Sequence, residues 1–253
     1  MAMSKRAQKA ASMARESAPP RRNRINFNEL AYEKIEDLLV RCVLRPGRFL
    51  TVQDLQDATG LGRTPVHNAV AQFAADTLIQ IRPRHGLQIA PIDLARERML
   101  LELRRDIERF VVRLATKRAT LSHRHQARNI ARALKDNRDR LTLEEFNKLD
   151  LRIDSLMLEA SGEPFLSHTL RPLHTIFRRI GFIYHRHTPG HADLAGTVDG
   201  HIAILAALTD GDATRAEAAS DRLMNFMESM FDDMAANIDP GLLDCGIEPL
   251  PIS

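Results

Sequence analysis

The sequence predicts a mainly α-helical protein: an N-terminal winged helix-turn-helix with a small β-hairpin wing, followed by an all-α bundle of six to seven helices. Two observations predict this fold class. Residues 51–91 contain two short helical patterns joined by a glycine turn and then two short extended runs. From residue 93 onward, long helical patterns follow one another without any strand-like alternation.

Composition and charge divide the chain into a basic front and a mildly acidic rear. Residues 1–92 contain 14 Lys and Arg against 8 Asp and Glu, whereas the remainder contains 22 against 25. Residues 1–24 are small, polar and basic and predict a disordered arm. We therefore expect an arm (1–24), a head that contacts nucleic acid (25–92), a helical body (93–238) and a tail (239–253).

The head begins with an amphipathic helix from Asn28 that ends near Pro46-Gly47. A second helical pattern covers Val52 to Thr59. The third helix is expected to open with Thr64 as N-cap and Pro65 in its first position. Its apolar stripe is formed by Val66, Ala69, Val70 and Phe73, so that its outward face carries Arg63, His67, Asn68 and Gln72.

Two extended runs follow, Leu78 to Arg82 and Leu87 to Ala90, around Pro83-Arg84-His85-Gly86. This pattern predicts a hairpin with basic residues at its tip. A basic hairpin beside an exposed helix is typical of a DNA-binding wing.

The body is predicted to contain helices at Leu94–Ala119, Ser122–Asn137, Leu143–Ser161, Pro164–His187, Ala192–Leu208 and Ala213–Asn237. Gly162 is the expected C-cap of the third. In the first of these helices we expect one inward side formed by Leu100, Leu103, Ile107, Phe110, Val111 and Leu114. The methionines of the last helix, Met224, Met227, Met230 and Met234, indicate core or dimer packing.

Several classes of protein are disfavoured by the composition. No apolar run approaches the ~20 residues of a membrane span, and the N-terminus has no apolar signal segment. Two cysteines, Cys42 and Cys245, provide neither a disulfide framework nor zinc-knuckle spacing. We therefore expect a cytoplasmic protein without membrane contact.

The head resembles the winged helix-turn-helix of the GntR transcription regulators, through Pro46-Gly47, the Arg63-Thr64-Pro65-Val66 segment and the wing Gly86. The resemblance implies operator DNA as a partner, with Arg63 reading guanine. Thr64 would contact phosphate, and Arg82, Arg84 and His85 would enter the minor groove or bind phosphate. The complete expected set of DNA-binding residues is Gln53, Arg63, Thr64, Pro65, His67, Asn68, Arg82, Arg84, His85 and Gly86.

Three positions depart from the family pattern. His67 stands where a second arginine is usual, Gly62 replaces a serine or threonine, and Gln53 replaces an often basic or polar contact residue. A neutral imidazole lacks the two-pronged geometry of arginine. We therefore expect an operator that differs from the common half-site at the base that faces His67.

The body resembles the all-helical effector-binding domain of the GntR subfamily typified by fatty-acid and lactate-type regulators. The landmarks are Asp150, Ala160-Ser161-Gly162, His201 and Gly211-Asp212. The resemblance implies a small carboxylate effector beside a divalent metal of the Zn, Ni or Mn type. Its ligand positions fall on Asp150, Asp154 (where the family has His), His201 and Leu223, which cannot coordinate a metal. Arg104 matches an arginine that faces the effector.

Alternatives remain open for these residues. The metal site is either retained with Asp150, Asp154 and His201, or lost, which would leave Asp154 in a salt bridge. Arg104 either compensates the two carboxylates or forms a surface pair with Glu108, four residues along the helix. A helix with His174, Arg178, Arg179 and Tyr184 is expected to border the cavity, whereas His185, His187 and His191 are expected to be incidental surface residues.

The sequence thus favours a ligand-responsive, homodimeric transcriptional regulator, in particular a repressor, that binds operator DNA and a small-molecule effector. Two other functions remain open. One is a metal-dependent enzyme that uses Asp150, Asp154 and His201. The other is an architectural DNA binder without an effector, whose bundle only dimerises.

Overall fold

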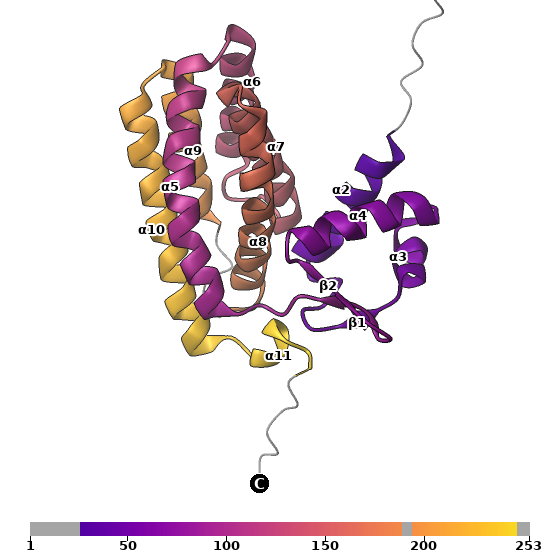
Figure 1. Cartoon of the computed structure of the whole chain (residues 1–253). Coiled ribbons are helices and arrows are strands. Elements are labelled where there is room, and N and C mark those ends of the chain that lie inside the picture. The colour runs from indigo at the N-terminus through magenta and orange to yellow at the C-terminus, as the bar shows by residue number, and fades with distance from the viewer. Residues whose placement is uncertain (1–25, 189–193, 247–253) are drawn as a thin grey trace, which may run out of the picture.

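The computed structural model describes residues 26–188 and 194–246 and places them in two adjoining bodies (Figure 1). The expected basic arm (1–24) and the last residues of the expected tail lie outside the described residues. Helices α5 to α10 stand side by side in a bundle, and α2 to α4 with a small sheet form the head beside it. No helix within the described ranges is long and apolar enough to cross a membrane.

The head contains α2 (Phe27–Val40), α3 (Val52–Thr59) and α4 (Arg63–Ala75). Helix α3 starts with a reciprocal capping box between Thr51 and Asp54. The N-cap of α4 is Gly62, which has no side chain for capping, so the predicted N-cap role of Thr64 is wrong. The predicted apolar stripe of α4 is confirmed, because Val66, Ala69, Val70 and Phe73 are all buried.

Three antiparallel strands form the wing, in the spatial order β1-β3-β2. The hairpin of β2 (Ile79–Arg82) and β3 (Gly86–Ile89) was expected, and its register pairs Ile79 with Ile89. Strand β1 (Phe49–Leu50) was not expected, since two residues are too few to show alternation. It pairs with β3 and ties the start of the helix-turn-helix to the wing.

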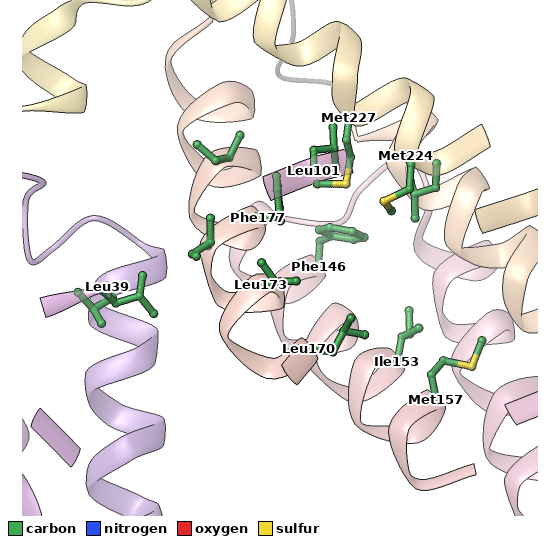
Figure 2. Close-up of a cluster of buried hydrophobic side chains, with 14 of the residues drawn as sticks. Leu39, Leu101, Phe146, Ile153, Met157, Leu170, Leu173, Phe177, Met224 and Met227 are labelled. Carbon is green, nitrogen blue, oxygen red and sulfur yellow. The ribbon is translucent and has the colours of Figure 1, made fainter. Parts of the chain in front are cut away.

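The body consists of α5 (Leu94–Arg118), α6 (Leu121–Asn137), α7 (Leu143–Ser161), α8 (Pro164–His187), α9 (Ala195–Asp210) and α10 (Ala213–Asn237). Each boundary lies within three residues of the sequence-based expectation. Gly162 caps α7 in the left-handed conformation, as expected. Figure 2 shows part of the core, in which labelled side chains of α7, α8 and α10 point toward one another. Met224, Met227, Met230 and Met234 are buried in that core.

The inward side of α5 differs from the expected one. Leu103 and Phe110 are 51% and 43% exposed, and the buried residues include Leu101, Arg104, Glu108 and Val111. Two of these buried residues are charged, and Arg104 and Glu108 pair with each other inside the bundle. A ladder of partly exposed ion pairs also joins α5 to α10. The ladder joins Arg98, Arg105, Arg109 and Arg113 of α5 to Asp232, Glu228, Asp221 and Glu217 of α10.

Part of the expected tail forms a short helix, α11 (Pro240–Leu243), below the junction of head and bundle (Figure 1). Two backbone hydrogen bonds attach this segment. The amide of Ile92 donates to Leu243 at 2.8 Å, and the amide of Cys245 donates to Pro46 at 2.9 Å. The C-terminal segment therefore joins the head to the linker that leads into α5.

Candidate functional site

The first turn of α4 and the tip of the wing expose the residues expected to contact DNA. Arg63, Thr64 and His67 are exposed, and Pro65 is half-buried. Gln53 and Asn68 are exposed but already engaged, Gln53 with Asp57 and Asn68 with Asn28. Within the described residues, Arg63 forms no ion pair. Its guanidinium therefore needs no internal partner to be broken before it meets a base or a phosphate.

The wing tip is a tight turn in which the His85 amide donates to the Arg82 carbonyl at 3.1 Å. Arg82, Arg84 and His85 are exposed, and the Arg82 Nε donates to Gln88 at 3.1 Å. Gly86 has a φ of +87°, and a Cβ there would lie 2.8 Å from the Leu50 carbonyl oxygen. The fold itself thus requires a glycine at this position, and the role of Gly86 in DNA binding stays a prediction.

A cavity lies inside the bundle between α5, α7, α8, α9 and α10, with an empty volume of about 490 Å³ including its mouth. Its polar side is formed by Arg104, Asp150, Arg178 and His201, together with Asn147, His185 and Thr197. Its apolar side is formed by Leu143, Phe146, Phe177, Leu223, Met227 and Met230. A mainly apolar cavity with a few convergent polar groups is the usual form of a small-molecule site.

His201 and Asp150 form a buried ion pair at the base of the cavity. The His201 Nε2 lies 2.8 Å from Asp150 Oδ1, and its Nδ1 lies 2.8 Å from the Thr197 carbonyl oxygen. Because a carbonyl only accepts, Nδ1 must carry a proton. Burial disfavours the imidazolium, but the hydrogen bond and charge of Asp150 outweigh burial and raise the pKa of His201. Both ring nitrogens are then donors.

The same pair acts on the carboxylate. Burial alone would raise the pKa of Asp150, but the hydrogen bond and charge of His201, together with Arg178 and Arg104, lower it to about 2. Asp150 is therefore ionised at neutral pH. His201, Arg178 and Arg104 of the same chain supply the positive charge that stabilises this carboxylate.

Asp154 does not join Asp150 in the cavity. It lies on the other side of Arg178, in a second hollow between α7, α8 and head helix α2. There its Oδ2 lies 3.3 Å from His174 Nδ1 and 3.4 Å from Arg178 Nη2. Burial, with repulsion from Asp150, raises the pKa of Asp154 above its ordinary value. The alternative in which Asp154 is held in a salt bridge is thus the one that the contacts favour.

The expected metal ligands do not fit a metal in this arrangement. His201 has no free lone pair while both nitrogens donate, Asp154 faces away, and the fourth position is the apolar Leu223. No cluster of three or more His, Cys, Asp or Glu side chains suited to a metal occurs among the described residues. The expectation of a metal at Asp150, Asp154 and His201 therefore finds no support in the donor set.

Arg104 lines the cavity but does not compensate the two aspartates directly. Its Nε and Nη2 both donate to Glu108 Oε1 at 3.1 Å, and its guanidinium lies 5.2 Å from the centre of the Phe177 ring. The expected alternative pairing with Glu108 occurs, but it is buried rather than on the surface. The His174 Nε2 lies 2.8 Å from the same Glu108 oxygen.

The compensating cation is Arg178 of α8. Its Nε lies 3.3 Å from Asp150, its Nη2 3.4 Å from Asp154, and its Nη1 3.5 Å from Glu36. Glu36 belongs to head helix α2 and is buried. The sequence placed Arg178 on a helix beside the cavity without specifying its face, and it gave no role to Glu36.

The cavity also contains buried donors without acceptors. The Nδ2 of Asn147 and the Nε of Arg178 are buried and have no hydrogen-bond partner, because the 3.3 Å approach to Asp150 lacks hydrogen-bond geometry. Arg104, Arg178 and His201 also line the cavity, where Arg104 is paired with Glu108, and Arg178 lies beside Glu36, Asp150 and Asp154. The two donors without partners, Asn147 Nδ2 and Arg178 Nε, are the groups of this cavity that still need acceptor atoms.

The expectation that the histidines near residue 187 are incidental surface residues is wrong for His185. This residue is buried, lines the cavity, and its Nε2 lies 3.2 Å from the Thr197 hydroxyl. His187 is exposed, as expected, and His191 lies outside the described residues. Helical spacing explains the result, because positions 174, 178, 181 and 185 share one face of α8.

The raised pKa of His201 predicts a pH-dependent contribution to stability. The contribution is fully present below the unfolded-state pKa of about 6.5 and is lost as the pH rises through the higher folded-state pKa. Asp150 stays ionised throughout that range. We expect the free energy of unfolding of wild type to exceed that of His201→Gln by more at about pH 6 than at about pH 9. Urea unfolding at both pH values checks this, and an equal or reversed difference would contradict it.

The sequence matches the models of two known protein families. Residues 28–89 match the family described as "Bacterial regulatory proteins, gntR family", and residues 99–226, about half of the chain, match the "FCD domain". The chain belongs to the GntR family, with an FCD domain after its DNA-binding head. The expected winged helix-turn-helix followed by a helical bundle is thereby confirmed.

Relatives of this GntR protein are regulators. The HTH-type transcriptional repressor RspR of Escherichia coli K12 is 26% identical over 205 residues, which cover 80% of this chain and 88% of that protein. A regulator from an unstable DNA locus of Streptomyces ambofaciens is 27% identical over 211 residues, covering 80% and 83%.

Solved structures share the fold. McbR/YncC of E. coli has a TM-score of 0.71 at 16% identity and covers 83% of this chain and 99% of its own. A putative GntR regulator of Rhodococcus sp. RHA1 has a TM-score of 0.59 at 18% identity, covering 83% and 97%. The GntR protein described here is a DNA-binding transcriptional regulator and not an enzyme, so the alternative of a metal-dependent enzyme is wrong.

Proposed function

We propose that this GntR protein is a ligand-responsive repressor that acts in the cytoplasm and binds operator DNA as a homodimer. Its effector is a small molecule with at least one carboxylate and an apolar body. The observation that carries this proposal is the composition of the bundle cavity. Arg104, Arg178 and His201 line it together with Asp150, and two buried donors there, Asn147 Nδ2 and Arg178 Nε, have no hydrogen-bond partner.

The shape of the cavity supports the apolar part of the effector. Phe146, Phe177 and Met227 line the cavity, and Figure 2 shows these three side chains near one another. A carboxylate placed at the arginines would extend its carbon body along these side chains. The name of the relative RspR, a repressor, supports the sign of regulation.

A thermal-shift screen of small monocarboxylic and dicarboxylic acids tests the proposal. A ligand that binds only the native protein stabilises it by about 2.7 kcal/mol at a hundredfold excess over its Kd. We expect at least one acid to raise the Tm of wild type, and Arg104→Gln to abolish most of that rise. Arg140→Gln, which removes an exposed arginine, is the matched control and should leave it unchanged. A screen without any shift favours the architectural DNA binder.

Operator recognition by two heads requires a dimer, and α5 offers a surface for it. Met99, Leu103 and Phe110 lie on one face of α5 and are 60%, 51% and 43% exposed. We expect Leu103→Glu to shift the protein from dimer to monomer in size-exclusion chromatography with light scattering. Glu102→Gln, at an exposed neighbouring position, should remain dimeric. A Leu103→Glu protein that stays dimeric would exclude this face as the interface.

A further inference from the structure

The contact between head and bundle contains a buried ionic link. Glu36 of α2 is 2% exposed and accepts a hydrogen bond from the Thr175 hydroxyl of α8. The same oxygen of Glu36 lies 3.5 Å from Arg178 Nη1. A buried carboxylate is costly unless it is paired, and the partners of Glu36 both belong to α8 of the bundle.

Arg178 also belongs to the cavity on its other side. Its Nε faces Asp150, whose remaining partner is His201, and it lines both the cavity and the hollow beside α2. One guanidinium therefore serves a head residue and the cavity wall at once. No other arginine of the described residues contacts carboxylates of both the head and the cavity.

We propose that Arg178 couples the two domains by competition: negative charge in the cavity draws its guanidinium away from Glu36 and loosens the head. An anion bound beside Asp150 adds an acceptor on the cavity side. Because the guanidinium is already 3.3 to 3.5 Å from each of its three carboxylates, a small displacement toward the cavity weakens the contact with Glu36. The coupling rests on the proposed function in one respect: that function identifies the anion in the cavity as a carboxylate effector.

Removing negative charge from the cavity should have the opposite effect to adding an anion, and this allows a test without effector. Replacing Asp150 with asparagine removes negative charge from the cavity side and leaves Arg178 more available to Glu36. The head should then dock more tightly. The effect must depend on Glu36, since that is the group for which the cavity competes.

Tyr32 is a native reporter of docking. It is 4% exposed, stacks on Phe73 of the head at 4.3 Å, and is covered on α8's side by Arg171, whose guanidinium lies 4.1 Å from the ring centre. Opening the contact between head and bundle uncovers this ring without unfolding the head. The chain has only one other tyrosine, Tyr184, which is buried in the bundle and serves as internal reference.

Hydroxyl-radical footprinting of the full-length protein, free of DNA and effector, measures the oxidation rate of Tyr32 relative to Tyr184. We expect Asp150→Asn to lower this ratio and Glu36→Gln to raise it, each by at least about threefold, as expected for directly coupled neighbours. In the double variant, Asp150→Asn should have no further effect. Glu33→Gln, an exposed carboxylate on the same helix, is the matched control and should preserve the full effect of Asp150→Asn.

The proposal is overturned if Asp150→Asn has the same effect with and without Glu36, or if Glu36→Gln leaves Tyr32 as protected as in wild type. Should Glu36→Gln fail to fold, Glu36→Asp keeps the charge but shortens the reach toward Arg178, and the same results are expected. Because neither DNA nor effector takes part, a failure here is distinct from a failure of the thermal-shift screen.

Discussion

Replacing Arg63 with alanine is expected to lower the affinity for operator DNA by about 1–3 kcal/mol in each half-site, roughly 5- to 150-fold. Arg63 is the first residue of α4, is exposed, and forms no ion pair with any described residue. Its guanidinium can therefore bind the O6 and N7 of guanine with two hydrogen bonds. Fluorescence anisotropy with the upstream region of the regulated gene, at fixed salt, measures the loss.

The experiment must distinguish a contact between Arg63 and a base from a contact between Arg63 and the phosphate backbone. An arginine that reads a base loses discrimination when it is removed, whereas one that binds phosphate weakens all sequences alike. We therefore expect Arg63→Ala to reduce operator affinity much more than affinity for unrelated DNA. Arg84→Ala on the wing is the comparison, and it should weaken both to a similar degree. An equal loss on both DNAs for Arg63→Ala would contradict its role as a base reader.

Replacing Arg178 with methionine is expected to destabilise the protein by about 3–5 kcal/mol at neutral pH, because three buried carboxylates lose their shared cation. The loss should shrink at about pH 4. Without the guanidinium, the folded-state pKa values of Asp150 and Asp154 rise, so these two carboxyl groups take up protons and their repulsion disappears as the pH falls.

Chemical denaturation at both pH values measures this effect. Arg186→Met is the matched control on the same helix, because Arg186 is exposed and its contact with Glu144 is long, 3.8 Å. We expect it to change the free energy of unfolding by no more than about 0.5 kcal/mol. An Arg178→Met protein as stable as this control would show that the buried carboxylates do not depend on Arg178.

Periodicity and capping residues predicted most of the fold. The boundaries of α7, α8 and α10 followed from apolar spacing, from Gly162 and from the prolines and aspartates at helix ends. Strand β1 and helix α11 were missed because each depends on pairing with distant backbone rather than on a local pattern. The inward side of α5 was misjudged because it includes the charged residues Arg104 and Glu108, whose burial as a pair does not show in the apolar pattern.

The site was predicted in part for similar reasons. The resemblance to the family identified Asp150, His201 and Arg104, and all three line one cavity. Side-chain direction separated Asp154 from them, since it faces the head across Arg178. The available signal for Glu36 was its helical spacing from the apolar residues Tyr32 and Leu39, which places a carboxylate on the apolar side of α2. For Arg178 and His185 the signal was their helical spacing on α8. Only tertiary contacts show that one arginine serves both domains.

The most direct measurement of the central claim is operator affinity with and without the acid that gives the largest thermal shift. Anisotropy titrations of the full-length protein would be run at one salt concentration. The account predicts that the saturating acid weakens operator binding at least about tenfold, which corresponds to 1.4 kcal/mol of coupling and lies within the usual range for linked sites. Superimposable titration curves, from a protein to which the acid is bound, would contradict it.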